Sequence, residues 1–180
     1  MPLRCSLISL FFLGCSLNAQ VEKFGGPGST GLGDSSGSIR FIDIAPQSDI
    51  RYQSNNHFTG RKYFPQPLCG GVGIFDYDND GKQDIFFTNG ANLPELKKVD
   101  SSFYNRLFRN LGDDRFEDVT EEAGLTGAHL GYSFGVAAGD YNNDGYADLF
   151  ISNAGPNVLY RNNRDGTFTD VTAGSWLDQK

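Results

Sequence analysis

The chain has 180 residues, 38% of them hydrophobic and 21% charged, which is enough for one ordinary domain with its own core. Its 23 glycines, 15 phenylalanines and 8 tyrosines are typical of an all-β protein with many tight turns. The formal net charge of −7 argues against the phosphate backbone of a nucleic acid as a partner.

Residues 1–19 are predicted to be a signal peptide, so we expect an exported protein that is secreted, periplasmic or held in the cell envelope. The apolar run 7–13 is too short to span a bilayer as a helix, and Ala19 offers a small residue before a cut. An alternative cut lies before Cys15, whose surroundings resemble the cleavage box of bacterial lipoproteins, although Phe12 departs from the small aliphatic residue usual there. Lipidation at Cys15 is the one route by which we expect a membrane to become a partner.

Residues 20–40 are rich in glycine and serine and predict a flexible linker, because such a composition buries little apolar surface. Glycines within it match a dinucleotide-binding fingerprint in letters only, since no strand precedes them and no helix follows, so no cofactor is expected there. After cleavage of the leader the chain keeps a single cysteine, Cys69, which excludes an internal disulfide.

Residues 41–180 form a repeat region with two copies, about 70–120 and 133–172. Residues 73–87 line up with 137–151, residues 105–110 with 157–162, and residues 116–120 with 168–172. The spacing between blocks is longer in the first copy, which therefore carries an insertion around residues 93–98. That insertion predicts a surface loop, with a site of specific contact as the alternative.

Each copy predicts four short antiparallel strands separated by turns, the pattern of one propeller blade. The expected second, third and fourth strands are 85–87, 107–109 and 116–119 in copy one, and 149–151, 158–160 and 168–171 in copy two. Residues 41–45 resemble the fourth-strand block and predict a stray N-terminal strand that joins the last blade. The fold class is thus all-β, an incomplete β-propeller of two complete four-stranded blades plus that strand.

Two acidic loops precede the second strands of the copies and predict calcium sites. Loop one (residues 76–84) offers Asp76, Asp78, Asp80 and Asp84, with the Lys82 carbonyl; loop two (residues 140–148) offers Asp140, Asn142, Asp144 and Asp148, with the Tyr146 carbonyl. Alternate side chains of a curled loop converge, and carboxylates so close together repel one another unless a cation lies among them. Calcium, which takes six to eight oxygen ligands, is the expected cofactor.

Two other structures use loops of similar composition. An EF-hand requires glutamate at position twelve and flanking helices, whereas Phe87 and Ile151 stand at that position between β-type runs. The loops could also be ordinary turns, for which Asp, Asn and Gly are well suited. With four carboxylates against three, loop one is predicted to bind calcium more tightly than loop two.

The motifs resemble FG-GAP/VCBS repeats, the blades of integrin-α-like propellers. The cores around residues 75–85 and 139–149, with the Arg-Asn and Asp-Val-Thr blocks after them, are similar to exported bacterial proteins that end in an ASPIC/UnbV module. The resemblance implies that the loop aspartates bind calcium and that the family serves in binding and adhesion. Two copies are fewer than the four to eight blades of a propeller, which predicts an N-terminal fragment of a longer protein or a truncated gene product.

The expected function is a calcium-binding repeat module that binds a protein or glycan ligand, not an enzyme. Acid–base or nucleophilic catalysis needs groups outside the metal loops, and the two histidines, His57 and His129, are expected to be loop residues without a catalytic partner. A fragment of a propeller-containing hydrolase or lyase is the alternative. A third interpretation is a structural fragment that binds only metal.

Overall fold

The computed structural model describes residues 41–68 and 70–175, so the predicted signal peptide, the predicted linker and Cys69 lie outside the described residues. The chain divides into two units, Met1–Ile44 and Ala45–Lys180, and the fold below is that of the second unit alone. Within the described residues, no helix has the length and apolar character needed to cross a membrane.

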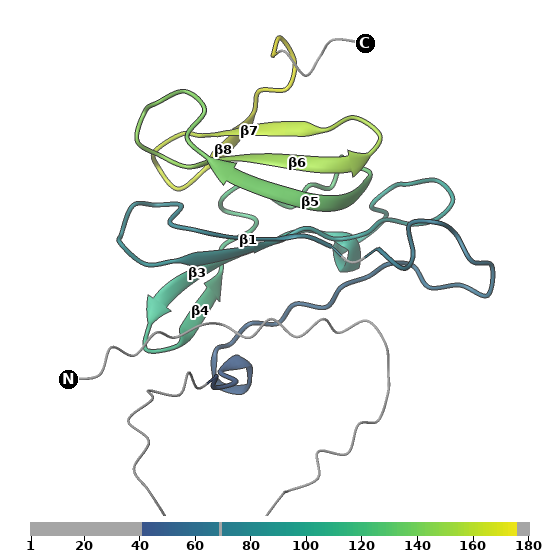
Figure 1. Ribbon diagram of the computed structural model, residues 1–180, viewed down its shortest axis with the longest axis horizontal. Helices are drawn as coiled ribbons and strands as arrows, with labels where there is room; N and C mark the ends of the chain where they lie inside the picture. Colours follow the sequence, from purple (N-terminus) through teal and green to yellow (C-terminus); the bar gives the residue numbers. More distant parts are fainter. Residues whose placement is uncertain (1–40, 69, 176–180) are drawn as a thin grey trace, which may run out of the picture. The chain divides into compact units, whose positions relative to one another are not determined.

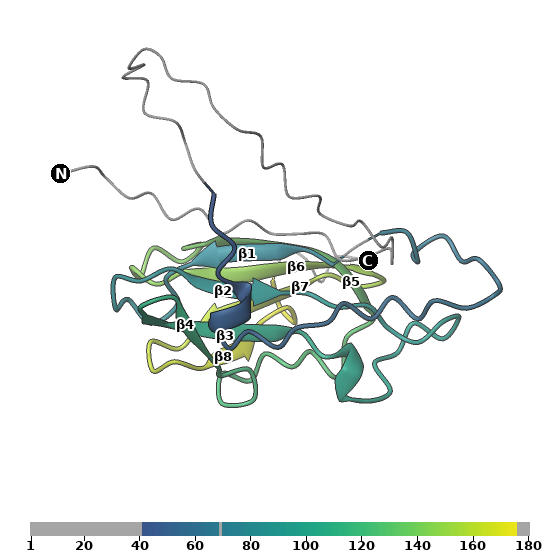
Figure 2. The same cartoon turned by 90° about the horizontal axis from the view of Figure 1, so that it is seen from below.

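Two four-stranded antiparallel sheets make up the fold, and they confirm the predicted all-β, incomplete propeller of two blades (Figures 1 and 2). Blade one consists of β1 (Val72–Phe75), β2 (Asp84–Phe87), β3 (Arg106–Gly112) and β4 (Arg115–Asp118); blade two consists of β5 (Tyr132–Gly139), β6 (Asp148–Ala154), β7 (Val158–Asn162) and β8 (Phe168–Asp170). In each blade every strand pairs with the next in chain order. Two short 3-10 helices, η1 (Ala45–Gln47) and η2 (Ser101–Phe103), lie outside the sheets.

The main core lies between the two blades. Alternation along the strands points one face of each sheet at the other, as in β1, where Phe75 is buried and Ile74 is exposed. Phe86 and Leu107 of blade one share a buried cluster with Leu149 and Ile151 of blade two. In Figure 1 the two sheets are accordingly seen as stacked layers.

The inner strands of the two blades approach each other very closely. A Cβ at Gly71, directly before β1, would lie 2.7 Å from the Cα of Gly135 in β5 and 2.9 Å from the carbonyl oxygen of Phe134. Contacts of that length are too short for a real Cβ, so this approach requires glycine at position 71.

The predicted stray strand at residues 41–45 is wrong. Residues 41–44 belong to no strand, and Ala45 begins η1 instead. Pro46 explains the difference, because proline has no backbone N–H to donate to a ladder and its fixed φ suits a helical turn. The chain then runs along blade one, where the Ser48 carbonyl accepts a hydrogen bond from Phe116 N of β4.

The insertion of copy one is not an idle surface loop. Leu93 is buried in a second cluster with Ala91 and Tyr132 of β5, so the insertion packs against blade two. Lys98 is 7% exposed, and its Nζ donates to the carbonyl oxygens of Asn89, Gly90 and Phe103 at 2.7, 2.9 and 2.7 Å. Burial lowers the pKa of Lys98 to about 7, while these oxygens favour the charged ammonium. The insertion therefore contacts both copies, blade two through Leu93 and copy one through Lys98, and we call it the brace.

Candidate metal centre

Loop one curls around the side chain of its first residue. The Asp76 carboxylate accepts hydrogen bonds from Asp80 N at 3.1 Å and Gly81 N at 2.8 Å. Asn79 and Gly81 have φ angles of 59° and 85°, a left-handed conformation that glycine tolerates at no steric cost and asparagine better than most residues. These two residues turn the chain sharply enough for the alternate carboxylates to face one another.

The ninth position of loop one lies at the start of β2 and is buried. Asp84 accepts hydrogen bonds from Tyr77 N at 3.0 Å and from Asn110 N of β3 at 2.7 Å. Burial raises the pKa of Asp84 to about 6, against the effect of these two N–H donors. A carboxyl with a raised pKa in a dry position is one whose charged form gains much from a bound cation.

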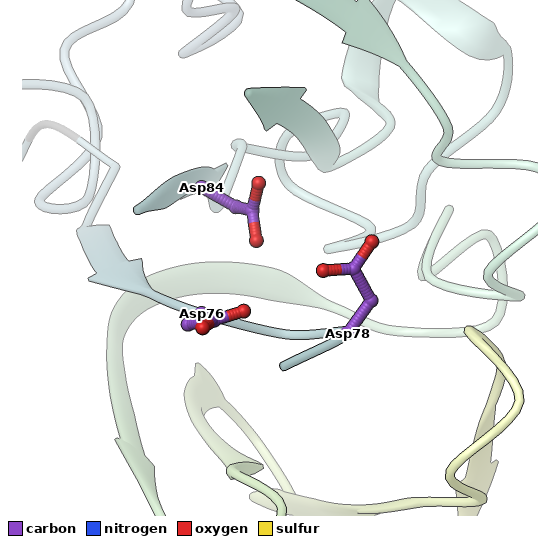
Figure 3. A group of neighbouring side chains, drawn as sticks. All are labelled: Asp76, Asp78 and Asp84. Carbon is purple, nitrogen blue, oxygen red and sulfur yellow. The ribbon is translucent and has the colours of Figure 1, made fainter. Parts of the chain in front are cut away.

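Asp76, Asp78 and Asp84 come together (Figure 3). One oxygen from each lies within 4.8 Å of the others, and Figure 3 shows the three carboxylates turned toward a common space. Oxygens that bind one calcium ion at about 2.3–2.6 Å are at most about 5 Å apart, so this donor set fits calcium in size and in chemistry.

Asp80, the fifth-position residue, does not join that group. Its carboxylate accepts a hydrogen bond from Lys82 Nζ at 2.6 Å and lies 3.9 Å from Arg109, and its pKa is lowered, chiefly by the hydrogen bonds from Lys82. Lys82 thus contacts the loop through its ammonium and its N–H. Arg109 also pairs with Asp78 at 2.9 Å. Two basic side chains, Lys82 and Arg109, therefore contact the carboxylates of loop one.

Loop two repeats the geometry of loop one almost contact for contact. Asp140 accepts from Asp144 N at 3.0 Å and Gly145 N at 2.7 Å, and Asp148 accepts from Tyr141 N at 3.1 Å and Asn162 N at 2.8 Å. Asn143 and Gly145 have φ angles of 58° and 88°, close to those of their counterparts in loop one.

The donor set of loop two differs in charge and in cover. Asn142 donates through Nδ2 to Asp144 at 3.0 Å, where loop one has the carboxylate of Asp78. Asp144 also pairs with Arg164 at 3.0 Å, and Tyr146 N donates to it at 3.0 Å. Burial raises the pKa of Asp148, as it does that of Asp84. Loop two thus presents three carboxylates and one amide, and one basic side chain, Arg164, contacts it.

The two loops are linked across the blade interface. Asn162 donates through Nδ2 to the Tyr77 carbonyl of loop one at 2.8 Å, while its backbone N–H binds Asp148 of loop two. Asn79 of loop one donates through Nδ2 to the Gly145 carbonyl of loop two at 3.0 Å. Two side-chain amides thus connect loop one with blade two, one of them directly to loop two.

The sequence profile of the FG-GAP-like repeat matches residues 76–151 and 140–179, which together are more than half of the chain. The chain belongs to the FG-GAP-like repeat family. Each match begins at the first aspartate of an acidic loop, so both loops lie within FG-GAP repeats.

A similar curated protein is cartilage acidic protein 1 of Xenopus tropicalis, with 29% identity over 148 residues. The match covers 77% of this chain and 20% of that protein. The chain thus spans about a fifth of the length of its relative.

Sequence reasoning missed several residues that shape the FG-GAP loops. Asn110 and Asn162 hold the buried aspartates through backbone N–H groups, and both stand in the repeated Arg-Asn block, so aligning the copies would have singled them out. Arg109 and Arg164 pair with loop carboxylates. Arg109 stands in the repeated Arg-Asn block, where it corresponds to Arg161, whereas no repeat pattern marks Arg164, whose counterpart in copy one is Gly112.

Proposed function

We propose that the chain is a calcium-binding FG-GAP module of an exported protein, and that it serves in adhesion or in binding a protein or glycan ligand. The observation that carries the metal assignment is the convergence of Asp76, Asp78 and Asp84 within 4.8 Å. Calcium would be held there, with the Lys82 carbonyl and Asp80 as further ligands. In loop two the ligands would be Asp140, Asn142, Asp144 and Asp148, with the Tyr146 carbonyl.

The role of the ion is structural, because the loop residues also hold the blades. Calcium would neutralise carboxylates whose backbone contacts fix the start of β2 and of β6, so binding in the folded state alone would stabilise the fold. The name of the relative, a cartilage acidic protein, supports an extracellular role and export. The proposal also includes a longer parent protein of the ASPIC/UnbV-associated type.

An enzymatic role has less support than a binding role. His57 Nδ1 accepts a hydrogen bond from Leu93 N at 2.7 Å, so this ring has a structural partner that the sequence did not reveal. His129 is exposed and lies 3.3 Å from Asp170, away from both metal loops. A calcium-dependent turnover of polysaccharide or phosphoester substrates would favour the hydrolase or lyase alternative.

The test is calorimetric titration of the chain with calcium, with melting curves in calcium and in chelator. We expect two binding events and a melting temperature that rises with calcium. At a free calcium concentration of one hundred times the dissociation constant, each occupied site should add about 2.7 kcal/mol to the free energy of unfolding. A folded chain that binds no calcium would return both loops to ordinary turns and overturn the metal assignment.

A further inference from the structure

A groove of about 370 Å³ lies beside blade one, away from both acidic loops. Residues 51–55 form one wall and residues 101–106 the other, with Asn89 between them. Its volume falls in the range of roughly 300–1,000 Å³ that is typical of small-ligand sites. The side chains that matter for its chemistry are Arg51, Tyr52, Asn55, Ser102, Tyr104 and Arg106.

A single buried side chain holds the two walls at a fixed spacing. Asn89 is 2% exposed; its Oδ1 accepts from Asn55 N at 2.7 Å. Its Nδ2 donates to the carbonyl oxygens of Ser102 and Tyr104 at 3.1 and 3.2 Å. The walls are therefore joined without a ligand, which lowers the entropic cost of binding one.

Each wall is also fastened to the blade. The Tyr52 ring stacks on Phe87 of β2 with centroids 4.3 Å apart, and its hydroxyl donates to the Thr88 carbonyl at 2.9 Å. On the other wall, the carbonyl of Phe103 receives the buried ammonium of Lys98. Asn55 Nδ2 then bridges the walls through Ser102 Oγ at 2.8 Å.

The lining is suited to an acidic, hydroxyl-rich ligand. Arg51 and Arg106 lie 3.8 and 3.6 Å from their carboxylate partners, beyond hydrogen-bond distance. Each arginine donates a hydrogen bond to one backbone carbonyl, Arg51 to Ile50 at 3.2 Å and Arg106 to Ser101 at 3.3 Å, although a guanidinium carries five N–H donors. Arginine binds carboxylates through two parallel hydrogen bonds, so these donors match a ligand carboxylate.

We propose that this groove binds an acidic saccharide, a short sugar chain that carries carboxylates. The guanidinium groups would take its carboxylates, the amide and hydroxyl groups of Asn55 and Ser102 its hydroxyls, and the ring of Tyr104 a flat sugar face. The net charge of −7 opposes an acidic ligand, but a Debye length of about 8 Å at physiological salt confines that repulsion. The site rests on the proposed binding function and needs no calcium ligand.

The test titrates the full chain with a tetrasaccharide of alternating glucuronate and N-acetylglucosamine, and with a neutral N-acetylglucosamine tetramer. We expect the acidic tetrasaccharide to bind and Arg51→Met and Arg106→Met each to weaken it at least tenfold. Arg115→Met is the matched control, because Arg115 is an exposed arginine of β4 outside the groove and its replacement should leave binding unchanged. Melting curves check that each variant is folded.

Calcium titration of the same samples separates this proposal from the calcium proposal. Calcium binding without binding of the acidic tetrasaccharide overturns the groove assignment alone, and saccharide binding without calcium binding supports it. Equal affinity for the neutral tetramer, or for a tetraglutamate peptide, overturns the acidic saccharide assignment. Full affinity in both the Arg51 and Arg106 variants overturns the site.

Discussion

Equivalent tyrosines of the two FG-GAP repeats differ in burial. Tyr77 of loop one is 5% exposed and stacks on Phe168 of blade two with centroids 6.5 Å apart, whereas its counterpart Tyr141 of loop two is 53% exposed. The backbone geometry of the two loops is nearly identical, so the difference comes from the neighbouring blade. What a repeat contributes to stability therefore depends on whether another blade covers its acidic loop.

The largest expected effect separates these two tyrosines directly. Tyr77→Ala should destabilise the chain by about 3–5 kcal/mol, as expected for removing a large aromatic side chain from a core. Tyr141→Ala should change stability by no more than about 0.5 kcal/mol, because it alters an exposed side chain. Chemical denaturation of both variants measures the difference. Comparable losses would show that the blade interface does not decide what this position contributes.

The brace in the insertion distinguishes the first repeat from the second. Lys98→Met should cost about 3 kcal/mol, because it leaves the carbonyl oxygens of Gly90 and Phe103 without the ammonium, while the Asn89 carbonyl keeps Ser133 N as its donor. Lys97→Met is the control, since Lys97 is exposed and next in sequence. Thermal melting distinguishes the two variants. A Lys98 variant as stable as the Lys97 variant would contradict the role of the insertion as a brace.

Asn110 and Asn162 provide a matched pair for the interface itself. Asn110 donates to the Gln83 carbonyl of its own blade, and Asn162 donates to the equivalent Ala147 carbonyl and also to Tyr77 of the other blade. We expect Asn162→Ala to cost about 2 kcal/mol and Asn110→Ala about 1 kcal/mol or less, since only the first leaves a buried group of the other blade unpaired. Urea denaturation gives both values, and the reverse order would count against the link between the loops.

The smallest expected effect is the difference in calcium affinity between the loops. Asp140→Ala leaves loop one as the intact site and Asp76→Ala leaves loop two. Calorimetry should then show loop one binding about tenfold more tightly, a difference of about 1.4 kcal/mol. Four carboxylates against three favour loop one, while Lys82 and Arg109 oppose the ion there and Arg164 alone does so in loop two. Equal affinities of the two surviving loops would contradict this ranking.

The repeat made much of the fold predictable from sequence. The strands Asp84–Phe87 and Asp148–Ala154 contain the expected runs 85–87 and 149–151 and start one residue before them, because two aligned copies mark nearly the same boundary twice. The acidic loops were equally visible, and the structure brings Asp76, Asp78 and Asp84 together as the spacing implied. Whether these residues bind calcium stays a prediction.

The remaining features depended on surroundings that no local pattern encodes. The sequence of residues 41–45 resembles the fourth-strand block of each copy. The other strands of a copy do not precede these residues, and Pro46 follows them, so the sequence left their pairing undetermined. Lys98 stands in a polar loop, where nothing in the sequence distinguishes a buried ammonium from an exposed one. Asp80 has the spacing of a ligand, yet it lies against Lys82 because that side chain can reach back two residues.

The contact between Gly71 and Gly135 bears on how many such sheets can surround one axis. If the two blades belong to a closed propeller, the close approach of β1 and β5 lets them diverge sharply toward their outer strands. Blades of a given width that diverge more sharply close a ring in smaller number. A methyl group at position 71, which would lie 2.7 Å from the Cα of Gly135, would hold these two strands apart and demand a wider ring. The glycine at position 71 would thus help to determine the number of blades in a closed propeller, which the topology of a single sheet does not determine.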